Sequence, residues 1–195
     1  VQEALQLLSV PGWLFYGFQR IDPLALRILG FSEDSHMSRR WFYLVPAQGE
    51  PRKLVHRIES SQLDHLPGIQ GEYLKWSELE SGLALLLKGM GRVAMQYSPE
   101  CAIPYVSKID AGTVELVRET GVEVVSSADL IQLFEAVLTP QQSQRQRRTA
   151  QTLTEIVNET FRETARADTK NKGLIYPLSA LRGEVPSHFH RGRPI

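Results

Sequence analysis

Residues 92–136 decide the fold of this chain and read RVAMQYSPECAIPYVSKIDAGTVELVRETGVEVVSSADLIQLFEA. Residues 92–98 (RVAMQYS) and 122–127 (VEVVSS) have the short strand patterns expected in a sheet. Between them, Asp110 precedes a helical pattern that Gly121 ends, and these residue types cap the start and the end of a helix. A second helical pattern follows directly. Strands that alternate with helices predict an α/β sheet covered by helices.

Upstream segments add strands to this sheet. Residues 12–18, GWLFYGF, form a short aromatic run of the kind found in buried strands. Residues 40–45 and 53–58 are two further strand patterns, and turn-forming residues occupy 46–51 between them. They are predicted to form a hairpin, which makes the sheet mixed rather than purely parallel.

A short helix and an irregular connection are also predicted in this half. Asp22 supplies a cap and Pro23 fits the first helical position, and Gly30 ends that helix. Residues 59–75 contain Pro67, Gly68 and Gly71 and favour a connection without regular structure.

Two more helices carry capping signals at their starts. Ser77 with Glu80, and Ser126 with Asp129, have the spacing of a capping box. The first of these helices is predicted to end near Gly89. Its apolar stripe, which should face the sheet, consists of Leu79, Leu83, Leu86 and Leu87.

The chain changes character after residue 140. Thr139 and Pro140 break the preceding helix, and a long helix is predicted to follow with an apolar stripe of Leu153, Ile156, Val157 and Phe161. The predicted organisation is a domain over residues 1–140, a linking helix over 141–167 and an irregular tail over 168–195.

Composition narrows the class of protein. The chain has 195 residues, of which 42% are hydrophobic and 23% charged, so a folded globular domain is expected. Residues 1–140 carry 12 Lys and Arg against 17 Asp and Glu, whereas 141–195 carry 10 against 5. The basic residues alternate with a helical apolar pattern, which favours a solvated helix face over a nucleic-acid surface.

Localisation signals point to the cytoplasm. Cys101 is the single cysteine, so no internal disulfide can form, and a reducing compartment fits best. No apolar run reaches the roughly 20 residues needed to span a bilayer. The opening residues, VQEALQLL, lack the features of a signal peptide.

The histidines give no convincing metal site. His188 and His190 alternate in HFHRG and could touch one metal ion, but protein metal sites use three or four ligands, which favours incidental affinity in a tail. His56 is predicted at a cross-strand surface position. His36 and His65 fall in predicted loops without an evident partner. No catalytic, cofactor-binding or metal-binding residue is therefore predicted.

Other candidate groups have structural explanations. Cys101 has no identifiable base nearby in sequence and is predicted to be a small buried hydrophobic residue. Residues 88–91, KGMG, lack phosphate-loop spacing and are interpreted as a helix end followed by a turn. Ser126 and Ser127 are explained by helix capping.

Aromatic residues are the remaining candidates for a binding surface. Most of them should be core residues, and some are expected at a subunit or domain interface, where Trp and Tyr are enriched. The set consists of Trp13, Trp41, Tyr43, Tyr73 and Trp76.

Four stretches, in order, resemble one known family. They are GWLFYGFQRIDPLALRILGF (12–31), RRWFYLVPAQGEPRKLVHRIE (39–59), YLKWSELESGLALLLKG (73–89) and the 92–136 segment. Together they resemble the N-terminal domain of the creatinase, prolidase and aminopeptidase P family of Xaa-Pro metallopeptidases. The resemblance implies a three-layer α/β/α sandwich with a mixed sheet, followed by a long helix that leads into a pita-bread catalytic domain.

In that family, two Asp, one His and two Glu of the catalytic domain hold two divalent metal ions, such as Mn, Co or Zn, which activate water to cleave the bond next to proline. From Asp168 onward the sequence departs from the family pattern. The chain is therefore expected to hold no cofactor and to be inactive alone.

The expected role is that of a non-catalytic domain that contributes oligomer contacts and part of the wall of the substrate entrance. The expected partners are a second copy of the chain, and its own catalytic domain if a longer product exists. The apolar stripe of the long helix could be covered by the chain's own sandwich, by residues 168–195 folded back or by a second copy, and the second copy is favoured because a two-fold dimer lets one stripe cover its copy. Neither nucleic acid nor membrane is expected as a partner. The alternatives are a stand-alone protein- or ligand-binding module derived from that domain, and a homologue whose parent has lost its metals.

Overall fold

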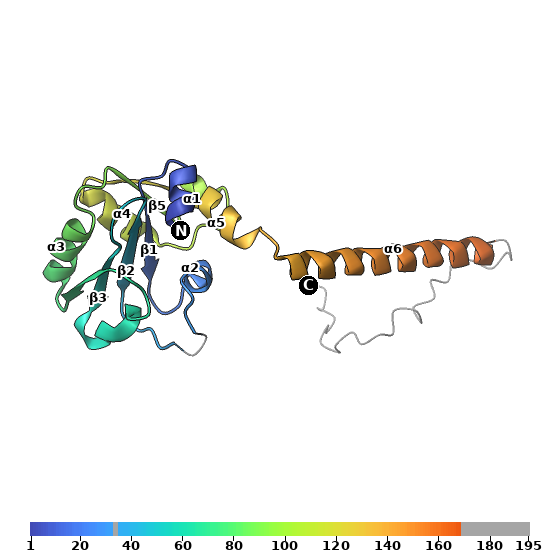
Figure 1. The fold of residues 1–195 in the computed structure, drawn as a ribbon, viewed down its shortest axis with the longest axis horizontal. Coiled ribbons are helices and arrows are strands. Elements are labelled where there is room, and N and C mark those ends of the chain that lie inside the picture. Colours follow the sequence, from blue (N-terminus) through green and yellow to red (C-terminus); the bar gives the residue numbers. More distant parts are fainter. Residues whose placement is uncertain (33–34, 169–195) are drawn as a thin grey trace, which may run out of the picture. The chain divides into compact units, whose positions relative to one another are not determined.

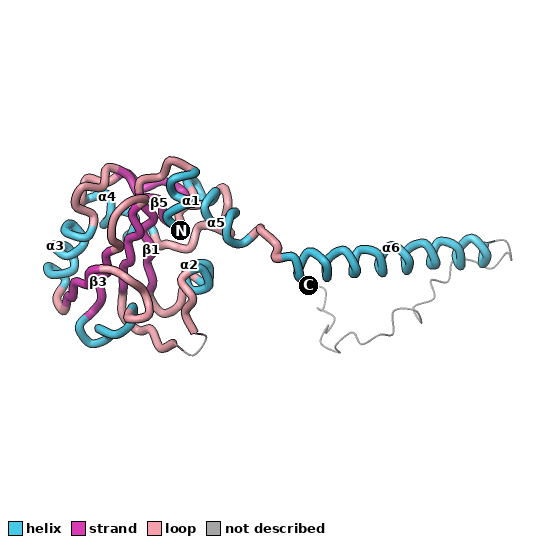
Figure 2. Tube along the Cα trace, viewed as in Figure 1, coloured by secondary structure: helices cyan, strands magenta, loops and turns pink. Residues whose placement is uncertain are grey.

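The computed structural model of this chain describes residues 1–32 and 35–168. The chain divides into two compact units, Val1–Val137 and Leu138–Ile195. Figures 1 and 2 show the arrangement of the elements in the first unit. Its elements are α1 (Gln2–Leu7), β1 (Gly12–Gly17), α2 (Pro23–Ile28), β2 (Trp41–Pro46), β3 (Arg52–His56), a 3₁₀ segment (Arg57–Leu63), β4 (Ile69–Tyr73), α3 (Trp76–Leu86), β5 (Arg92–Met95), a 3₁₀ turn (Pro99–Cys101), α4 (Ala111–Glu119), β6 (Glu123–Ser126) and α5 (Ala128–Glu135).

The six strands form one mixed sheet in the order β4-β3-β2-β1-β5-β6. β2 is antiparallel to β1 and β3, and the remaining neighbours are parallel. The predicted hairpin is confirmed, with Phe42 opposite Leu54. This hairpin makes the sheet mixed, as the turn residues between its strands indicate.

Helices cover both faces of the sheet, so the predicted three-layer α/β/α sandwich is confirmed. The alternation of side chains along a strand sends Trp13 and Phe15 of β1 to one face, and Leu14 and Tyr16 to the other. The Trp13 face is covered by α1, α2 and α5, and the Leu14 face by α3 and α4. β1 is therefore buried along its whole length between two apolar layers.

Two of the predicted caps are confirmed. The Asp22 carboxylate accepts hydrogen bonds from the N–H groups of Leu24 and Ala25 at the start of α2. The Asp110 carboxylate accepts one from the N–H of Thr113 in α4. Each cap satisfies donors that a helix leaves free in its first turn.

The predicted cap of α3 is wrong. The helix begins at Trp76, one residue before the predicted Ser77, and Lys75 is its N-cap residue. The Glu78 carboxylate accepts hydrogen bonds from the N–H groups of Leu74 and Lys75, and these bonds lower its pKa. A carboxylate at the third helical position performs this function whatever side chain occupies the cap itself.

The predicted burial of the leucine stripe is confirmed for Leu79, Leu83, Leu86 and Leu87.

The prediction of an irregular connection over residues 59–75 is also wrong, since this segment contains a 3₁₀ segment and the edge strand β4. β4 reads IQGEY, has a central glycine and exposes its first four residues, so its sequence carries little strand signal. It forms because β3 offers it a parallel ladder, which begins where the Ile69 N–H donates to the Pro51 carbonyl.

Two buried side chains attach the segment after β3 to the sheet. The Lys53 ammonium donates to the carbonyls of Leu63 and Leu66, at 3.1 and 2.8 Å. The Tyr43 hydroxyl donates to the Pro67 carbonyl, and burial raises the pKa of this phenol. These bonds satisfy main-chain acceptors that a covered loop would otherwise leave unpaired.

The second unit contains one long helix, α6 (Pro140–Asp168). The Thr139 hydroxyl accepts a hydrogen bond from the Gln142 N–H, and the Gln142 side chain accepts one from the Thr139 N–H, so the helix start is doubly capped. The predicted long helix is thus present. In the part of the chain that is described, no helix has both the length and the apolar content that a bilayer crossing requires.

Candidate functional site

The carboxyl ends of five strands lie at one edge of the sheet. β1, β5 and β6 are parallel, and β3 and β4 share their direction because β2 is antiparallel to both of its neighbours. The strand order reverses at β1. The strands β2, β3 and β4 lie on one side of it, and β5 and β6 lie on the other. In open α/β sheets this position is where ligand sites form. The side chains at this edge therefore define the candidate site.

Buried polar atoms without a hydrogen-bond partner also belong to residues at this edge. Most buried polar atoms in proteins are paired, so unpaired ones mark places where the fold tolerates a cost. Among the described residues, these atoms are Asp22 Oδ2, Trp41 Nε1, Gln96 Nε2 and Ser127 Oγ. They follow β1, begin β2 and follow β5 and β6, respectively. All four of these side chains thus lie at the same end of the sheet.

An arginine lies against two aromatic rings at this edge. The Arg40 guanidinium carbon is 5.9 Å from the ring centroid of Phe18 and 5.4 Å from that of Trp76. These three residues, which we call the Arg40 cluster, come from the segments that follow β1, precede β2 and begin α3. Each such cation–π contact contributes about 0.5–1 kcal/mol when exposed to solvent.

Hydrogen bonds fix the Arg40 cluster in place. The Tyr73 hydroxyl donates to the Arg40 carbonyl at 2.7 Å, and burial raises the pKa of Tyr73 to about 12, so the phenol remains a donor at neutral pH. The Trp76 indole N–H donates to the Glu80 carboxylate at 2.6 Å. Trp76 is 54% exposed although both its ring and its N–H are held. An exposed, immobilised tryptophan beside an arginine has the character of a binding hot spot.

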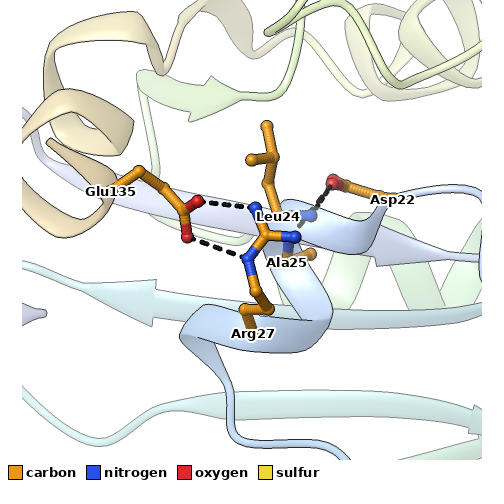
Figure 3. Close-up of polar contacts among 5 residues, drawn as sticks. All are labelled: Asp22, Leu24, Ala25, Arg27 and Glu135. Atoms are coloured by element: carbon orange, nitrogen blue, oxygen red, sulfur yellow. Dashed lines mark hydrogen bonds and ion pairs between the residues drawn. The ribbon is translucent and has the colours of Figure 1, made fainter. Parts of the chain in front are cut away.

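Asp22 lies on the opposite face of the sheet, at the start of α2 (Figure 3). Its Oδ1 atom accepts both cap hydrogen bonds at 3.0 Å, and the residue is only 2% exposed. Burial raises the pKa of this carboxyl to about 6, and the hydrogen bonds from Ala25 and Leu24 and the nearby positive charges only partly oppose it. The charged form of Asp22 is therefore costly in the folded chain.

A bidentate ion pair joins two helices on this same face (Figure 3). Arg27 of α2 donates from Nε and Nη2 to the Glu135 carboxylate of α5, at 3.2 and 2.5 Å. Exposed pairs contribute about 0–1 kcal/mol, and this one is half exposed at the arginine. It links α2 to α5 and is interpreted as a structural contact.

A groove of about 450 Å³ lies between β4 and α3. Gly71 of β4 and Gly82 of α3 line the groove on either side of Leu54. A Cβ atom at Gly82 would lie 2.8 Å from Leu54 Cδ1, so α3 packs closely on Leu54 there, whereas one at Gly71 would lie 3.6 Å away. Ile69 and Leu85 border the groove and are 62% and 68% exposed. Its other lining residues are Arg52, Lys53, Gln70, Glu72, Leu86 and Lys88. We call this feature the β4 groove.

The aromatic set predicted from the sequence divides as expected between core and surface. Trp13, Trp41, Tyr43 and Tyr73 are buried, and Trp76 is exposed. The Arg40 cluster itself was not predicted. Its three members are separated in sequence by more than 20 residues each and come together only in the folded sheet, so no local pattern could reveal them.

The histidines occupy the predicted kinds of position where the structure describes them. His56 pairs with Tyr73 across β3 and β4, with ring centroids 5.0 Å apart, and its Nδ1 accepts from the Ile58 N–H. His36 and His65 lie in exposed loops; the His65 ring does have a partner, the Phe31 ring at 4.5 Å. His188 and His190 lie outside the described residues, as does the predicted tail.

The predicted burial of Cys101 is wrong, because its thiol is exposed. Pro99 opens a 3₁₀ turn, and Glu100 and Cys101 have positive φ angles of 56° and 53°. This conformation turns the chain away from the sheet directly after β5, so the apolar neighbours of Cys101 in sequence do not place it in the core.

The two remaining sequence candidates have structural roles. Residues 88–91 follow the end of α3, and Gly89 adopts φ 84°, as a turn after a helix requires. The Ser126 hydroxyl accepts a hydrogen bond from the Ala128 N–H at the start of α5. Ser127 is the N-cap residue of α5 and its side chain makes no cap hydrogen bond, so the predicted capping box of Ser126 with Asp129 is wrong.

The described residues do not fit the two-metal site that the family resemblance implies for the catalytic domain. Across 1–32 and 35–168, no three His, Cys, Asp or Glu side chains come together in a group that could hold a metal ion.

Comparison with known proteins defines the class of fold. The chain is similar in structure to a Creatine_N superfamily domain of a dipeptidase from Streptococcus thermophilus, with a TM-score of 0.51 and 13% sequence identity over 69% of this chain and 94% of that one. It is also similar to a proline dipeptidase from Streptococcus pneumoniae, with a TM-score of 0.52 and 17% identity over 70% of this chain and 95% of that one. The first unit thus has the creatinase/prolidase N-terminal domain fold.

A longer protein shows the same fold within a larger chain. Dipeptidase PepE from Mycobacterium ulcerans matches with a TM-score of 0.54 and 16% identity over 73% of this chain, which spans only 36% of that protein. No protein-family model matches the sequence, and no curated protein is similar to it. The likeness at these identities is one of fold.

Proposed function

We propose that this chain is the non-catalytic N-terminal domain of an Xaa-Pro metallopeptidase-like protein of the aminopeptidase P and prolidase type. The observation that carries the proposal is the structural match to a Creatine_N superfamily domain of a dipeptidase, which covers 94% of that domain. The ordered resemblance of four sequence stretches supports it. The proposed location is the cytoplasm, which the single cysteine supports.

The proposed role of the domain is to supply contacts. The Arg40 cluster offers an exposed, immobilised Trp76 next to a fixed positive charge, which suits part of the wall of a substrate entrance. In this role the domain touches and orients a peptide or a neighbouring domain. The two metal ions would belong to the catalytic domain of the parent protein, which would activate water there.

The purified chain is expected to hydrolyse no Xaa-Pro dipeptide, with Mn, Co or Zn added. The described residues offer no group of ligands for these ions, and metal-activated water is the nucleophile in the reaction of the family. The measurement is release of proline after removal of host peptidases by two chromatographic steps. Metal-dependent turnover that co-purifies with the chain and is lost in His188→Ala would contradict the proposal.

A second copy of the chain is the proposed oligomeric partner, through the apolar stripe of α6. Leu153, Ile156, Val157 and Phe161 are all about half exposed or more, with Phe161 at 71%. Apolar area left in water costs about 25 cal/mol per Å², so this stripe favours association. A two-fold dimer lets one stripe cover its copy.

The variant Phe161→Glu is expected to weaken this dimer at least about tenfold, since it places a charge in the stripe. Sedimentation velocity over a concentration series measures the effect. Gln151→Glu adds the same charge on another face of α6 and is expected to leave association unchanged. Equal sedimentation of both variants and the unmodified chain would rule out the stripe as an interface.

A stand-alone binding module is the alternative function, and the exposure of Trp76 is the observation that favours it. The coding sequence after Ile195, read in all three frames, separates the two proposals. An Asp, Asp, His, Glu, Glu ligand set there supports the peptidase domain, whereas its absence in every frame supports the binding module. A parent that has lost its metals would show the same domain with substitutions in that set.

A further inference from the structure

We propose that the edge strand β4 pairs with the β4 strand of a second copy of this chain, antiparallel and centred on Gly71, so that two six-stranded sheets become continuous. This inference specifies an oligomer contact of the proposed function, but it rests on the geometry of β4. It does not need the peptidase relationship.

The hydrogen-bonding direction of β4 follows from its ladder with β3. The Ile69 N–H donates to the Pro51 carbonyl, so Ile69 directs its main-chain polar groups toward β3. Successive residues of a strand alternate in this respect, and Gly71 and Tyr73 also face β3. The N–H and C=O groups of Gln70 and Glu72 therefore lie on the open side of the sheet.

This edge lacks the features that usually prevent pairing. Edge strands are commonly protected by lysine, proline or a bulge, and β4 reads IQGEY. Its five residues pair with β3 in unbroken register, from Ile69 opposite Arg52 to Tyr73 opposite His56. Its single charge, Glu72, already lies 3.7 Å from Arg57. The strand is thus a regular, accessible template.

The sequence of β4 is complementary to itself in one antiparallel register. With Gly71 on the two-fold axis, Gln70 of each chain faces Glu72 of the other, an amide opposite a carboxylate rather than two like charges. Because these are the residues with outward main-chain groups, each such pair exchanges two hydrogen bonds. A two-fold axis repeats the arrangement, as an isologous interface requires.

The side chains of β4 that point toward α3 are also brought together by this register. The same register places Ile69 of one chain opposite Tyr73 of its copy, on the side of the sheet that α3 covers. Ile69 and Leu85 are largely exposed next to the β4 groove, and both would be covered in the pair. The hydrogen-bonding match of Gln70 with Glu72 and the cover that the pair gives to the exposed Ile69 are the reasons to assign a second copy, rather than an unrelated peptide, to this edge.

The glycine at the axis provides a direct test. In this register the two Gly71 residues form a non-hydrogen-bonded pair with Cα atoms about 4.5 Å apart, which is within the range of a disulfide. A Cβ atom at Gly71 would meet only Leu54 Cδ1 at 3.6 Å and the Lys53 carbonyl at 3.7 Å, so a cysteine fits there. The exposed Cys101 is first changed to Ser to remove the native thiol.

In the Cys101→Ser background, Gly71→Cys is expected to form a covalent dimer under mild oxidation. Gly91→Cys, at an exposed glycine with no atom within 4 Å of the added Cβ, is the matched control and should form no covalent dimer. Adding Ile69→Lys to Gly71→Cys is expected to slow cross-linking about tenfold or more, because it places a charged side chain opposite Tyr73 of the second copy. Circular dichroism establishes that each variant is folded.

Phe161→Glu separates this inference from the contact proposed for α6. Cross-linking through Gly71→Cys should persist when Phe161→Glu is added, because strand pairing does not use the stripe. Cross-linking no faster than that of Gly91→Cys, unaffected by Ile69→Lys, or abolished by Phe161→Glu would overturn the pairing. None of these results bears on whether the chain hydrolyses peptides, which the activity assay decides separately.

Discussion

Leu83→Ala is expected to lower the free energy of unfolding by about 2–5 kcal/mol, the usual cost of removing a fully buried leucine. Leu83 lies in the middle of α3 and is 0% exposed. It belongs to the apolar cluster between α3 and the sheet, with Leu14 and Leu44 of the central strands. The helix cannot move toward the sheet to close the resulting cavity, because it already packs closely on Leu54 at Gly82. A Cβ atom added at Gly82 would lie only 2.8 Å from Leu54 Cδ1.

Urea or guanidinium denaturation followed by circular dichroism measures this effect. Leu85→Ala is the matched control, since the same substitution in the same helix removes a side chain that is 68% exposed, and its expected cost is below about 0.5 kcal/mol. Low micromolar concentration keeps association from contributing to stability. Equal midpoints for the two variants would show that the leucine stripe does not face the core.

Asp22→Asn is expected to stabilise the chain at pH 7 and to have little effect near pH 4. The pKa of Asp22 is raised to about 6 by burial, from an ordinary value of 3.8. Below the unfolded pKa the carboxyl is protonated in both states, and no penalty exists. As the pH rises through 4 to 6, the folded chain must ionise a buried group, and stability is lost up to about 3 kcal/mol above pH 6.

Asparagine keeps the acceptor oxygen that caps α2 and carries no charge. The difference in unfolding free energy between Asp22→Asn and the unmodified chain, measured at several pH values from 4 to 8, isolates this one group from other carboxylates. Asp110→Asn exchanges the cap of α4, where the carboxylate is exposed, and should give no gain at pH 7. A difference for Asp22→Asn that is constant with pH would contradict the assignment.

The raised pKa of Asp22 also has a structural meaning for the candidate site. The cap hydrogen bonds use Oδ1 alone, and Oδ2 is buried without a partner among the described residues. The edge of the sheet that carries the Arg40 cluster on one face thus carries a costly carboxyl on the other. Functional edges of α/β sheets commonly retain such unsatisfied groups, which is why this edge, rather than the opposite one, is the candidate surface.

The two proposed contacts of this chain make separate demands on geometry. Pairing of β4 extends a sheet, whereas the stripe of α6 packs one helix on another. Both are two-fold contacts, and they yield one closed dimer only if they share an axis; with different axes they would join copies into longer assemblies. Sedimentation of Phe161→Glu, of Ile69→Lys and of the double variant is therefore expected to show which of the two contacts sets the size of the assembly.

Local sequence patterns are sufficient to predict the central strands and most of the helices. The aromatic run of β1, the valines of β5 and β6 and the leucines of α3 have the period and residue types that only a buried position tolerates. Asp22 and Asp110 predict helix starts because their effect is confined to the next three residues. These signals are local, so they are readable without the fold.

Three features depend on contacts that form only in the folded chain: the strand β4, the Arg40 cluster and the exposure of Cys101. β4 has weak strand propensity and exists because β3 presents main-chain partners to it, a contact that no local pattern encodes. Phe18, Arg40 and Trp76 meet because three strand ends converge at one edge of the sheet. Cys101 turns outward at a positive φ. For β4 and the Arg40 cluster, the interactions join residues that are distant in sequence. For Cys101, a local backbone conformation overrides the tendency of cysteine to be buried. Neither effect can be read from residue types alone.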